Sequence, residues 1–314
     1  MKPIIISGLP RTGSTMLYNL LSCDPAARTP RFFEMSHMAN PTPPITEATK
    51  ETDPRINEVH KRFDETEKLF PGMWTEAGKS HRSHPNEIEE DLLLLLQGFL
   101  MQIHIPYIDE KYIEWYNKED DKDYAYRYHQ LFFQLLNHAW TPQSHWALKA
   151  PIHTTYLDTL LKFYPDARLV FTHREPSTVV PSWGRLLESY VHWTFQPFSV
   201  DLIEYGRKNL KNLVLMSERL LVFRKKLKQE QFFDVDYNVF VKNPIGMVEA
   251  MYNHFGLQVS DEFRENMKKW IADNRQGKYG RREYSLSDYN QTEEEVNDAF
   301  HNYNAVFFPH LVNK

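Results

Sequence analysis

The feature that most constrains this chain is a glycine-bounded loop that directly follows its first apolar run. Pro3 to Ser7 contains three consecutive isoleucines, which is typical of a strand buried on both faces. The loop Gly8-Leu9-Pro10-Arg11-Thr12-Gly13 comes next, and Ser14 to Ser22 then has the apolar spacing of a helix. A strand, a glycine-rich turn and a helix in this order predict the opening unit of a parallel α/β sheet.

The same alternation returns in the second half of the chain. We expect further strands at residues 31–35, 145–148, 167–172 and 232–235. We expect helices at 87–104, 124–140, 154–164, 176–189, 199–229, 244–255 and 260–273. The segment from about 40 to 140 begins with three prolines and is mostly helical in pattern. The prediction is one domain over residues 1–314: a three-layer α/β sandwich with a central parallel sheet, P-loop-like, and a helical insertion at about 40–140 as cap.

Residues 8–15 have the spacing of the nucleotide phosphate loop G-x-x-x-x-G-K-[ST], except that Ser14 stands in the lysine position. Backbone N–H groups and the helix N-terminus can still hold an anion there, and Arg11 adds positive charge. The lysine that reaches a γ-phosphate in nucleoside triphosphatases is missing. An ordinary βα turn of a Rossmann-like protein is the alternative interpretation of this loop alone.

A second candidate anion site follows the strand expected at 167–172. Arg174 comes directly after that strand, and Ser182 lies eight residues later, about two turns into the next helix. Ligands of open α/β sheets bind at the carboxyl ends of the strands. The pattern predicts that Arg174 and Ser182 hold a second phosphate together, although Arg174 taken singly is also compatible with a surface salt bridge.

Composition narrows the class of protein. The chain has 37 Lys+Arg against 42 Asp+Glu, a net charge of −5, which argues against a nucleic-acid-binding protein. The single cysteine, Cys23, excludes a disulfide framework and a cysteine-built zinc site. We find no room for a signal peptide and no apolar run near the ~20 residues of a membrane span. These observations lead us to expect a cytoplasmic protein without a membrane span.

Four blocks of sequence together resemble the sulfotransferase superfamily, most closely its bacterial-type branch, which is related to protein-tyrosine and cytosolic sulfotransferases. They are residues 8–15 (GLPRTGST), 146–153 (WALKAPIH), 164–168 (YPDAR) and the pair Arg174 and Ser182. Weaker similarities are Tyr237 with 242–244 (KNP), and 284–289 (YSLSDY). The blocks occur in the order of the family, which makes the resemblance specific.

The resemblance implies transfer of a sulfuryl group from 3′-phosphoadenosine 5′-phosphosulfate to a hydroxyl or amine, with adenosine 3′,5′-bisphosphate as product and no metal. It implies that Arg11, Thr12, Gly13, Ser14 and Thr15 hold the 5′-phosphosulfate, and that Arg174 and Ser182 hold the 3′-phosphate. Tyr237 is then placed near the adenine, or else is a core aromatic residue. Arg281 and Arg282 match a late basic segment that closes over the 3′-phosphate in the family.

Sulfuryl transfer requires in-line positioning, charge stabilisation on the leaving phosphate oxygen and removal of the acceptor proton. Arg11 and Lys149 are the candidates for the leaving-group side. Glu34 and His153 compete as general base. Glu34 resembles the glutamate of protein-tyrosine sulfotransferases, whereas His153 lies two residues beyond the place of the histidine in the cytosolic enzymes. The choice between them stays open.

Two other functions remain as alternatives: a P-loop kinase or nucleoside triphosphatase, and a nucleotide-binding protein without catalysis. Ser14 in the lysine position argues against the first, and the set of Arg11, Glu34 and Lys149 against the second. The acceptor is not fixed by the sequence; a small molecule, a glycan, a lipid and a peptide all fit. A homodimer is compatible with the sequence, but no motif specifies one.

Overall fold

The computed structural model describes residues 2–36, 51–78, 83–100, 110–118, 122–194, 201–274 and 284–312. Its centre is a sheet of four strands in the order β2-β1-β3-β4, and every pair of neighbours is parallel. The strands are β1 (Ile4–Gly8), β2 (Ala147–Lys149), β3 (Arg168–His173) and β4 (Phe232–Asp236). The predicted parallel α/β fold is therefore confirmed.

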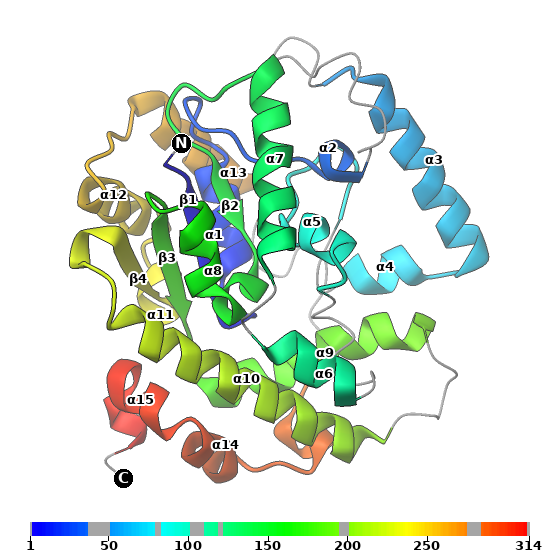
Figure 1. Ribbon diagram of the computed structural model, residues 1–314, viewed down its shortest axis with the longest axis vertical. Coiled ribbons are helices and arrows are strands. Elements are labelled where there is room, and N and C mark those ends of the chain that lie inside the picture. The colour runs from blue at the N-terminus through cyan, green and yellow to red at the C-terminus, as the bar shows by residue number, and fades with distance from the viewer. Residues whose placement is uncertain are drawn as a thin grey trace.

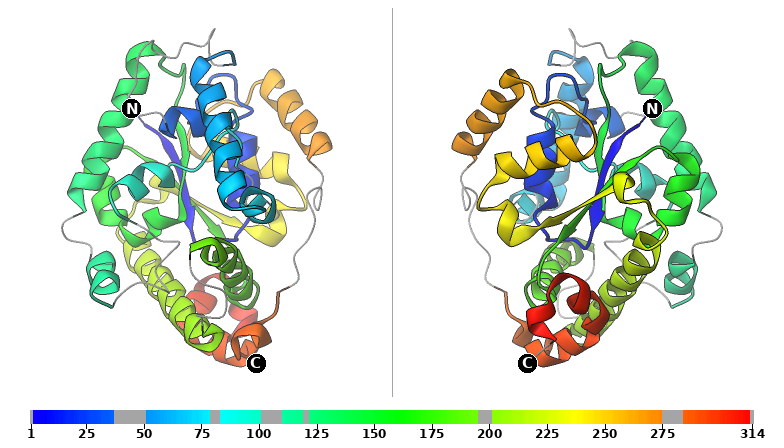
Figure 2. Two further views of the ribbon diagram at one scale, coloured as in Figure 1. Left: turned by 90° about the vertical axis from the view of Figure 1, so that its right-hand side faces the viewer. Right: turned by 90° about the vertical axis from the view of Figure 1, so that its left-hand side faces the viewer.

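Successive side chains of β1 enter two different hydrophobic cores, because side chains alternate between the faces of a strand. Ile5 packs into the core that also contains Leu148 and Phe171, whereas Ile4 and Ile6 enter the second core. All three isoleucines are fully buried. The first core receives side chains from helices α5 (Leu92–Gln97), α7 (Asp123–Ala139), α8 (Leu157–Phe163), α9 (Pro176–Thr194) and α10 (Leu202–Arg224). The second core receives them from α1 (Ser14–Leu21), α12 (Pro244–His254) and α13 (Asp261–Asp273). The sheet is thus the middle of three layers, as Figure 2 shows with the strands between the two groups of helices.

The helices lie in the connections between the strands and after the last strand, and they are labelled in Figure 1. In the first half they are α1 (Ser14–Leu21), α2 (Phe32–Ser36), α3 (Pro54–Leu69), α4 (Met73–Gly78), α5 (Leu92–Gln97), α6 (Glu110–Asn117) and α7 (Asp123–Ala139). In the second half they are α8 (Leu157–Phe163), α9 (Pro176–Thr194), α10 (Leu202–Arg224), α11 (Tyr237–Phe240), α12 (Pro244–His254), α13 (Asp261–Asp273), α14 (Glu293–Ala299) and α15 (His301–Phe307). The described residues also contain 3₁₀ segments at Pro151–Thr155, Gln229–Gln231, Leu286–Tyr289 and Pro309–Leu311.

Two predicted elements are wrong. The strand expected at 31–35 is the short helix α2, preceded by a single bridge from Arg31 to Ile88. Glu34 explains the difference, because its carboxylate accepts the backbone N–H of Arg31 and so stabilises the first turn of a helix. The helix expected at 87–104 is helical only over Leu92–Gln97, since the backbone departs from helical geometry at Gly98; residues 101–104 lie outside the described ranges.

The strand order produces a topological switch point at the carboxyl end of the sheet. The chain leaves β1 toward β2 on one side, and leaves β3 toward β4 on the other. The neighbours β1 and β3 therefore flank the topological switch point, where ligands bind in open α/β sheets. The loop 9–13 follows β1 and Arg174 follows β3, so the two predicted anion-binding segments meet at this point. Among the described residues, no helix has the length and apolar character to cross a bilayer.

Candidate functional site

The loop after β1 has a backbone that requires glycine at two places. Gly8 has φ +116° and Gly13 has φ +85°, and a Cβ on Gly8 would lie 2.8 Å from the backbone oxygen of Thr172. A Cβ on Gly13 would lie 2.8 Å from the ring of Tyr237. Arg11 itself has φ 63°. The spacing of the two glycines is therefore a packing requirement of a loop held between β3 and Tyr237.

Buried hydroxyl groups fix the loop at both of its ends. The Thr154 hydroxyl accepts the N–H of Gly8 at 2.8 Å and donates to the carbonyl of the same residue. Thr12 is fully buried and donates to the Leu9 carbonyl at 2.7 Å, and its hydroxyl lies 2.6 Å from that of Thr172. The Thr12 hydroxyl is thus used within the protein. Of the expected contacts of Thr12 with a donor, those of its backbone are compatible with this structure.

Arg11, Arg174 and Ser182 come together although 171 positions separate the first from the last. Arg11 Nε donates to Ser182 Oγ at 3.0 Å, and Arg174 Nη1 donates to the Arg11 carbonyl at 3.2 Å. The Arg174 guanidinium lies 4.2 Å from the ring centroid of Tyr237. Burial lowers the pKa of Arg11, and the nearby charge of Arg174 lowers it further. Because the charges of the two arginines act on each other, an anion that contacts both would be stabilised.

The N-terminus of α1 adds a second source of positive potential beside these arginines. Gly13 is the N-cap residue and provides no side-chain hydrogen bond to the first turn. Ser14 is buried, whereas Thr15 is exposed at the start of the helix. An uncapped helix N-terminus after a glycine loop is a common anion-binding arrangement. The residues expected to hold a 5′-phosphosulfate, Arg11 to Thr15, therefore lie together between β1 and the first turn of α1. We call this segment the rim.

Lys149 ends β2 at the same rim. Its side chain is 4% exposed, its ammonium donates to a carboxylate oxygen of Glu90, and it lies 3.4 Å from the Thr15 hydroxyl. The sequence gives Glu90 no separate role, because the acidic run 89–91 directly precedes the apolar stretch of α5 and falls within the helix expected at 87–104. Three acidic residues in front of an apolar run were the available signal. The lysine and the acid meet across 59 positions of sequence, so only the tertiary structure pairs them.

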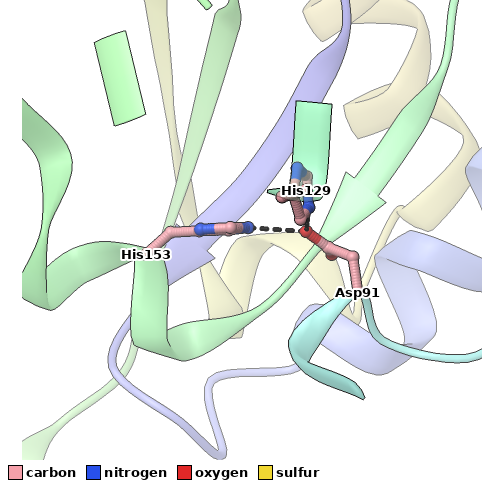
Figure 3. A group of neighbouring side chains, drawn as sticks. All are labelled: Asp91, His129 and His153. Carbon is pink, nitrogen blue, oxygen red and sulfur yellow. Dashed lines mark hydrogen bonds and ion pairs between the residues drawn. The ribbon is translucent and has the colours of Figure 1, made fainter. Parts of the chain in front are cut away.

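His153 lies in a buried polar network and not on the open rim. It is fully buried, its Nδ1 lies 2.9 Å from the Tyr126 hydroxyl, and its Nε2 lies 2.7 Å from Asp91 Oδ2. His129 Nε2 lies 2.8 Å from the same oxygen, and Figure 3 shows both imidazoles directed at it. Both ring nitrogens of His153 are therefore engaged inside the protein, which argues against the expectation that it accepts a proton from a substrate.

Asp91, His129 and His153 have the residue types of a metal site, and their ligand atoms lie within 4.8 Å of one another. Both Nε2 atoms point at a single carboxylate oxygen at hydrogen-bond distances, so that oxygen occupies the point of convergence that a metal ion would need (Figure 3). Burial alone raises the pKa of Asp91, but the two histidines outweigh this and hold it well below its usual range. Burial lowers the pKa of His129. The geometry is that of a carboxylate that accepts two imidazole N–H groups.

Glu34 lies in a buried ion pair. Its Oε1 accepts Arg28 Nη2 at 2.7 Å, with the two side chains 2% and 1% exposed, and its Oε2 accepts the N–H of Arg31 at 2.8 Å. Arg28 forms its bridge with Trp146, which precedes β2, whereas Lys149 ends that strand. The partner of Glu34 thus sits at the end of β2 that faces away from the rim.

Of the remaining candidates, the structure describes Tyr237 but not the two late arginines. Tyr237 begins α11 and packs between Gly13 and Arg174, so it lies against the loop. Arg281 and Arg282 lie outside the described residues.

Comparison with known proteins agrees with this geometry. The sequence model of the family described as Sulfotransferase family matches residues 3–261. Two curated relatives, each named omega-hydroxy-beta-dihydromenaquinone-9 sulfotransferase Stf3, come from Mycobacterium bovis and Mycobacterium tuberculosis. Each is 25% identical over 128 residues, which is 40% of this chain and 32% of the relative. The match thus spans about a third of the length of these relatives.

Two solved structures resemble the whole described fold. Sulfotransferase STF1 from Mycobacterium tuberculosis is 31% identical with a TM-score of 0.79, covering 96% of this chain and 76% of that one. Sulfotransferase STF9 from Mycobacterium avium is 27% identical with a TM-score of 0.84, covering 98% and 77%.

Proposed function

This chain belongs to the sulfotransferase family, and we propose that it transfers a sulfuryl group from 3′-phosphoadenosine 5′-phosphosulfate to an acceptor hydroxyl. The observation that carries the proposal is the contact of Arg11 with both Ser182 and Arg174 at the switch point of the sheet. A donor with anionic groups on both sides of a ribose requires two adjacent anion sites. The rim after β1 and the pair after β3 supply them.

In this proposal the chain holds its donor mainly through charge and backbone. The loop residues Gly13, Ser14 and Thr15 present the N-terminus of α1 to the phosphosulfate, and Arg11 adds its guanidinium. Arg174 and Ser182 hold the 3′-phosphate. Tyr237 keeps Arg174 in place by lying under its guanidinium.

Lys149 is proposed to act on the leaving group. The donor supplies an activated sulfuryl group whose transfer leaves negative charge on a phosphate oxygen. An ammonium group that is 4% exposed can stabilise that charge more strongly than one in open solvent. Its neighbour Thr15, at the start of α1, places it beside the phosphosulfate positions.

The acceptor is proposed to be an alcohol or phenol. The name of the Stf3 relatives describes a hydroxylated menaquinone as their acceptor, and the shared portion includes a third of those proteins. Sulfuryl transfer to any hydroxyl requires a base, so the rim must also supply a proton acceptor.

Thermal unfolding with nucleotides tests the proposal. Adenosine 3′,5′-bisphosphate at about 100 times its Kd should stabilise the protein by about 2.7 kcal/mol, roughly a 4 °C rise in Tm. ATP with magnesium and 5′-AMP should give much smaller shifts. Arg174→Gln should weaken bisphosphate affinity about 10- to 100-fold, because it removes a charge-assisted hydrogen bond.

Arg207→Gln is the matched control, since Arg207 is 65% exposed on α10 and pairs with Glu204 at the surface. Equal stabilisation by ATP with magnesium, or no effect of the bisphosphate, would contradict the proposed donor.

A further inference from the structure

Glu90 forms an ion pair at the rim that donor binding does not explain. Its side chain is 12% exposed and pairs with Lys149, the ammonium assigned to the leaving group. Glu90 also lies close enough to Arg11 and to Tyr190 of α9 to act on both electrostatically. The Glu90 carboxylate therefore interacts with both of the cations that we assign to the phosphosulfate.

The chain fixes this carboxylate in place through its two neighbours. The carbonyl of Glu89 accepts the Tyr18 hydroxyl at 3.1 Å, which ties this segment to α1. Asp91 Oδ1 accepts the backbone N–H of Lys149 at 2.7 Å. Lys149 is therefore bonded to Asp91 through its backbone and to the adjacent Glu90 through its side chain. Asp91 is held in turn by two buried histidines. The positions of Glu90 and Lys149 are thus set by one rigid network.

We propose that Glu90 accepts the proton of the acceptor hydroxyl, and that Lys149 passes from Glu90 to the leaving phosphate oxygen when the donor binds. The inference rests on the proposed function and names a catalytic group for it.

In the step, the acceptor oxygen forms its bond to sulfur while the bond from sulfur to the bridging oxygen breaks. The electron pair of that broken bond stays on the phosphate oxygen, beside the Lys149 ammonium. The acceptor proton moves to the Glu90 carboxylate, which returns it to water after the products leave.

Electrostatics favours this division of roles. Before the donor binds, the Lys149 ammonium is paired with the Glu90 carboxylate. An anionic donor offers that ammonium a second negative partner, the leaving phosphate oxygen, and so draws it away from Glu90. The Glu90 carboxylate is therefore available to the acceptor hydroxyl only in the loaded site.

The two bases considered from the sequence are less suited to this step. Glu34 uses both oxygens in bonds to Arg28 and to the N–H of Arg31, and protonating it would leave the buried Arg28 charge uncompensated. His153 is fully buried with both nitrogens engaged.

The variant Glu90→Gln tests the inference, with Glu87→Gln as control, because Glu87 is exposed on the same segment. Two readouts are needed: the Kd for adenosine 3′,5′-bisphosphate, and the rate at which sulfate is released from the donor with water as acceptor. The water reaction needs a base and requires no knowledge of the natural acceptor.

We expect Glu90→Gln to lower the rate at least 100-fold, in the usual range for loss of a general base. Its bisphosphate affinity should be unchanged or tighter, because a carboxylate that competes for Lys149 and Arg11 is gone. With a phenol that is already ionised at the assay pH, the rate loss should nearly vanish. Glu90→Ala should recover part of its rate with formate, which supplies a carboxylate and guards against a folding defect in either variant.

Three results would overturn the inference. They are an unchanged rate in Glu90→Gln, a rate loss that follows weakened bisphosphate binding, and an equal loss with the ionised phenol. Failure of the wild-type protein to bind the bisphosphate would remove the proposed function, and this inference with it, before any variant is compared.

Discussion

Replacement of Glu34 by glutamine should act on stability before it acts on catalysis. Arg28 and Glu34 form an ion pair whose side chains are 1% and 2% exposed. Arg28 also donates to the carbonyls of Leu136 and Trp140, and its guanidinium lies 4.1 Å from the Trp140 ring centroid. The arginine is therefore fixed by several partners and cannot move its charge to solvent when its carboxylate is removed.

The size of the effect follows from this confinement. Removing one partner of a buried ion pair costs about 3–5 kcal/mol, because the other charge stays buried without compensation. Glutamine keeps one hydrogen-bond acceptor, so we expect a loss near the lower end, about 3 kcal/mol. For a chain of 314 residues, this corresponds to a fall in Tm of about 4–5 °C.

Urea unfolding of four proteins would measure it: the wild type, Glu34→Gln, Arg28→Met and the double variant. The double variant should be more stable than the sum of the two losses predicts, by about 2 kcal/mol, because it contains no unpaired buried charge. Glu51→Gln is the control, since Glu51 pairs with Arg31 at the surface with 58% exposure and should change stability by under about 1 kcal/mol.

The donor hydrolysis rate of Glu34→Gln completes the experiment. We expect a rate close to that of the wild type at a temperature where both are folded. A Glu34→Gln variant that keeps its stability and loses turnover about 100-fold would refute this reasoning and identify Glu34 as the base.

Two further predictions concern acid stability and the loop. Burial lowers the pKa of His145 to about 4, whereas its value in the unfolded chain is about 6.5. The free energy of unfolding is therefore unaffected by His145 above pH 6.5 and decreases as the pH falls below it, because the unfolded chain binds the proton more tightly. The loss should reach roughly 3 kcal/mol by pH 4, and His145→Gln should flatten that part of the pH profile of urea unfolding; equal slopes would contradict it. Gly13→Ala and Gly256→Ala both place a side chain at positive φ, but only the first meets a neighbour, the Tyr237 ring at 2.8 Å. Both should lose about 1–2 kcal/mol of stability, and only Gly13→Ala should lose tenfold or more in bisphosphate affinity by calorimetry; equal affinities would show that the contact does not shape the loop.

The parts of the fold that were predictable are those with a local cause. Three isoleucines before a glycine loop indicate a buried strand wherever the rest of the chain lies, and the structure has β1 there. The strand expected at 31–35 is wrong, because the hydrogen bond that favours a helix there joins the Glu34 carboxylate to the N–H of Arg31. A side-chain bond of this kind is decided by conformation and leaves no trace in apolar periodicity.

The site divides in the same way. Glycine spacing and the arginine after a strand are local patterns, and they indicated the segments that meet at the switch point. The pairing of Glu90 with Lys149, and the burial of His153, depend on how α5 and α7 pack against β2. No spacing rule connects residues 59 positions apart, so a sequence motif can identify Lys149 but not its partner Glu90.

The buried network around Asp91 explains how the Lys149 backbone is held in place at the end of β2. A fully buried carboxylate is costly unless its oxygens are satisfied, and Asp91 has two imidazole N–H groups and the N–H of Lys149 to satisfy it. An apolar residue would fill the same space without that demand, but it could not bond to the backbone at the end of β2. The two histidines therefore have a positioning role. They hold Asp91, and Asp91 in turn binds the backbone N–H of Lys149 and is the next residue after Glu90. In the proposed reaction, a proton acceptor on a segment tied to Lys149 would fix the two ends of the in-line transfer relative to each other.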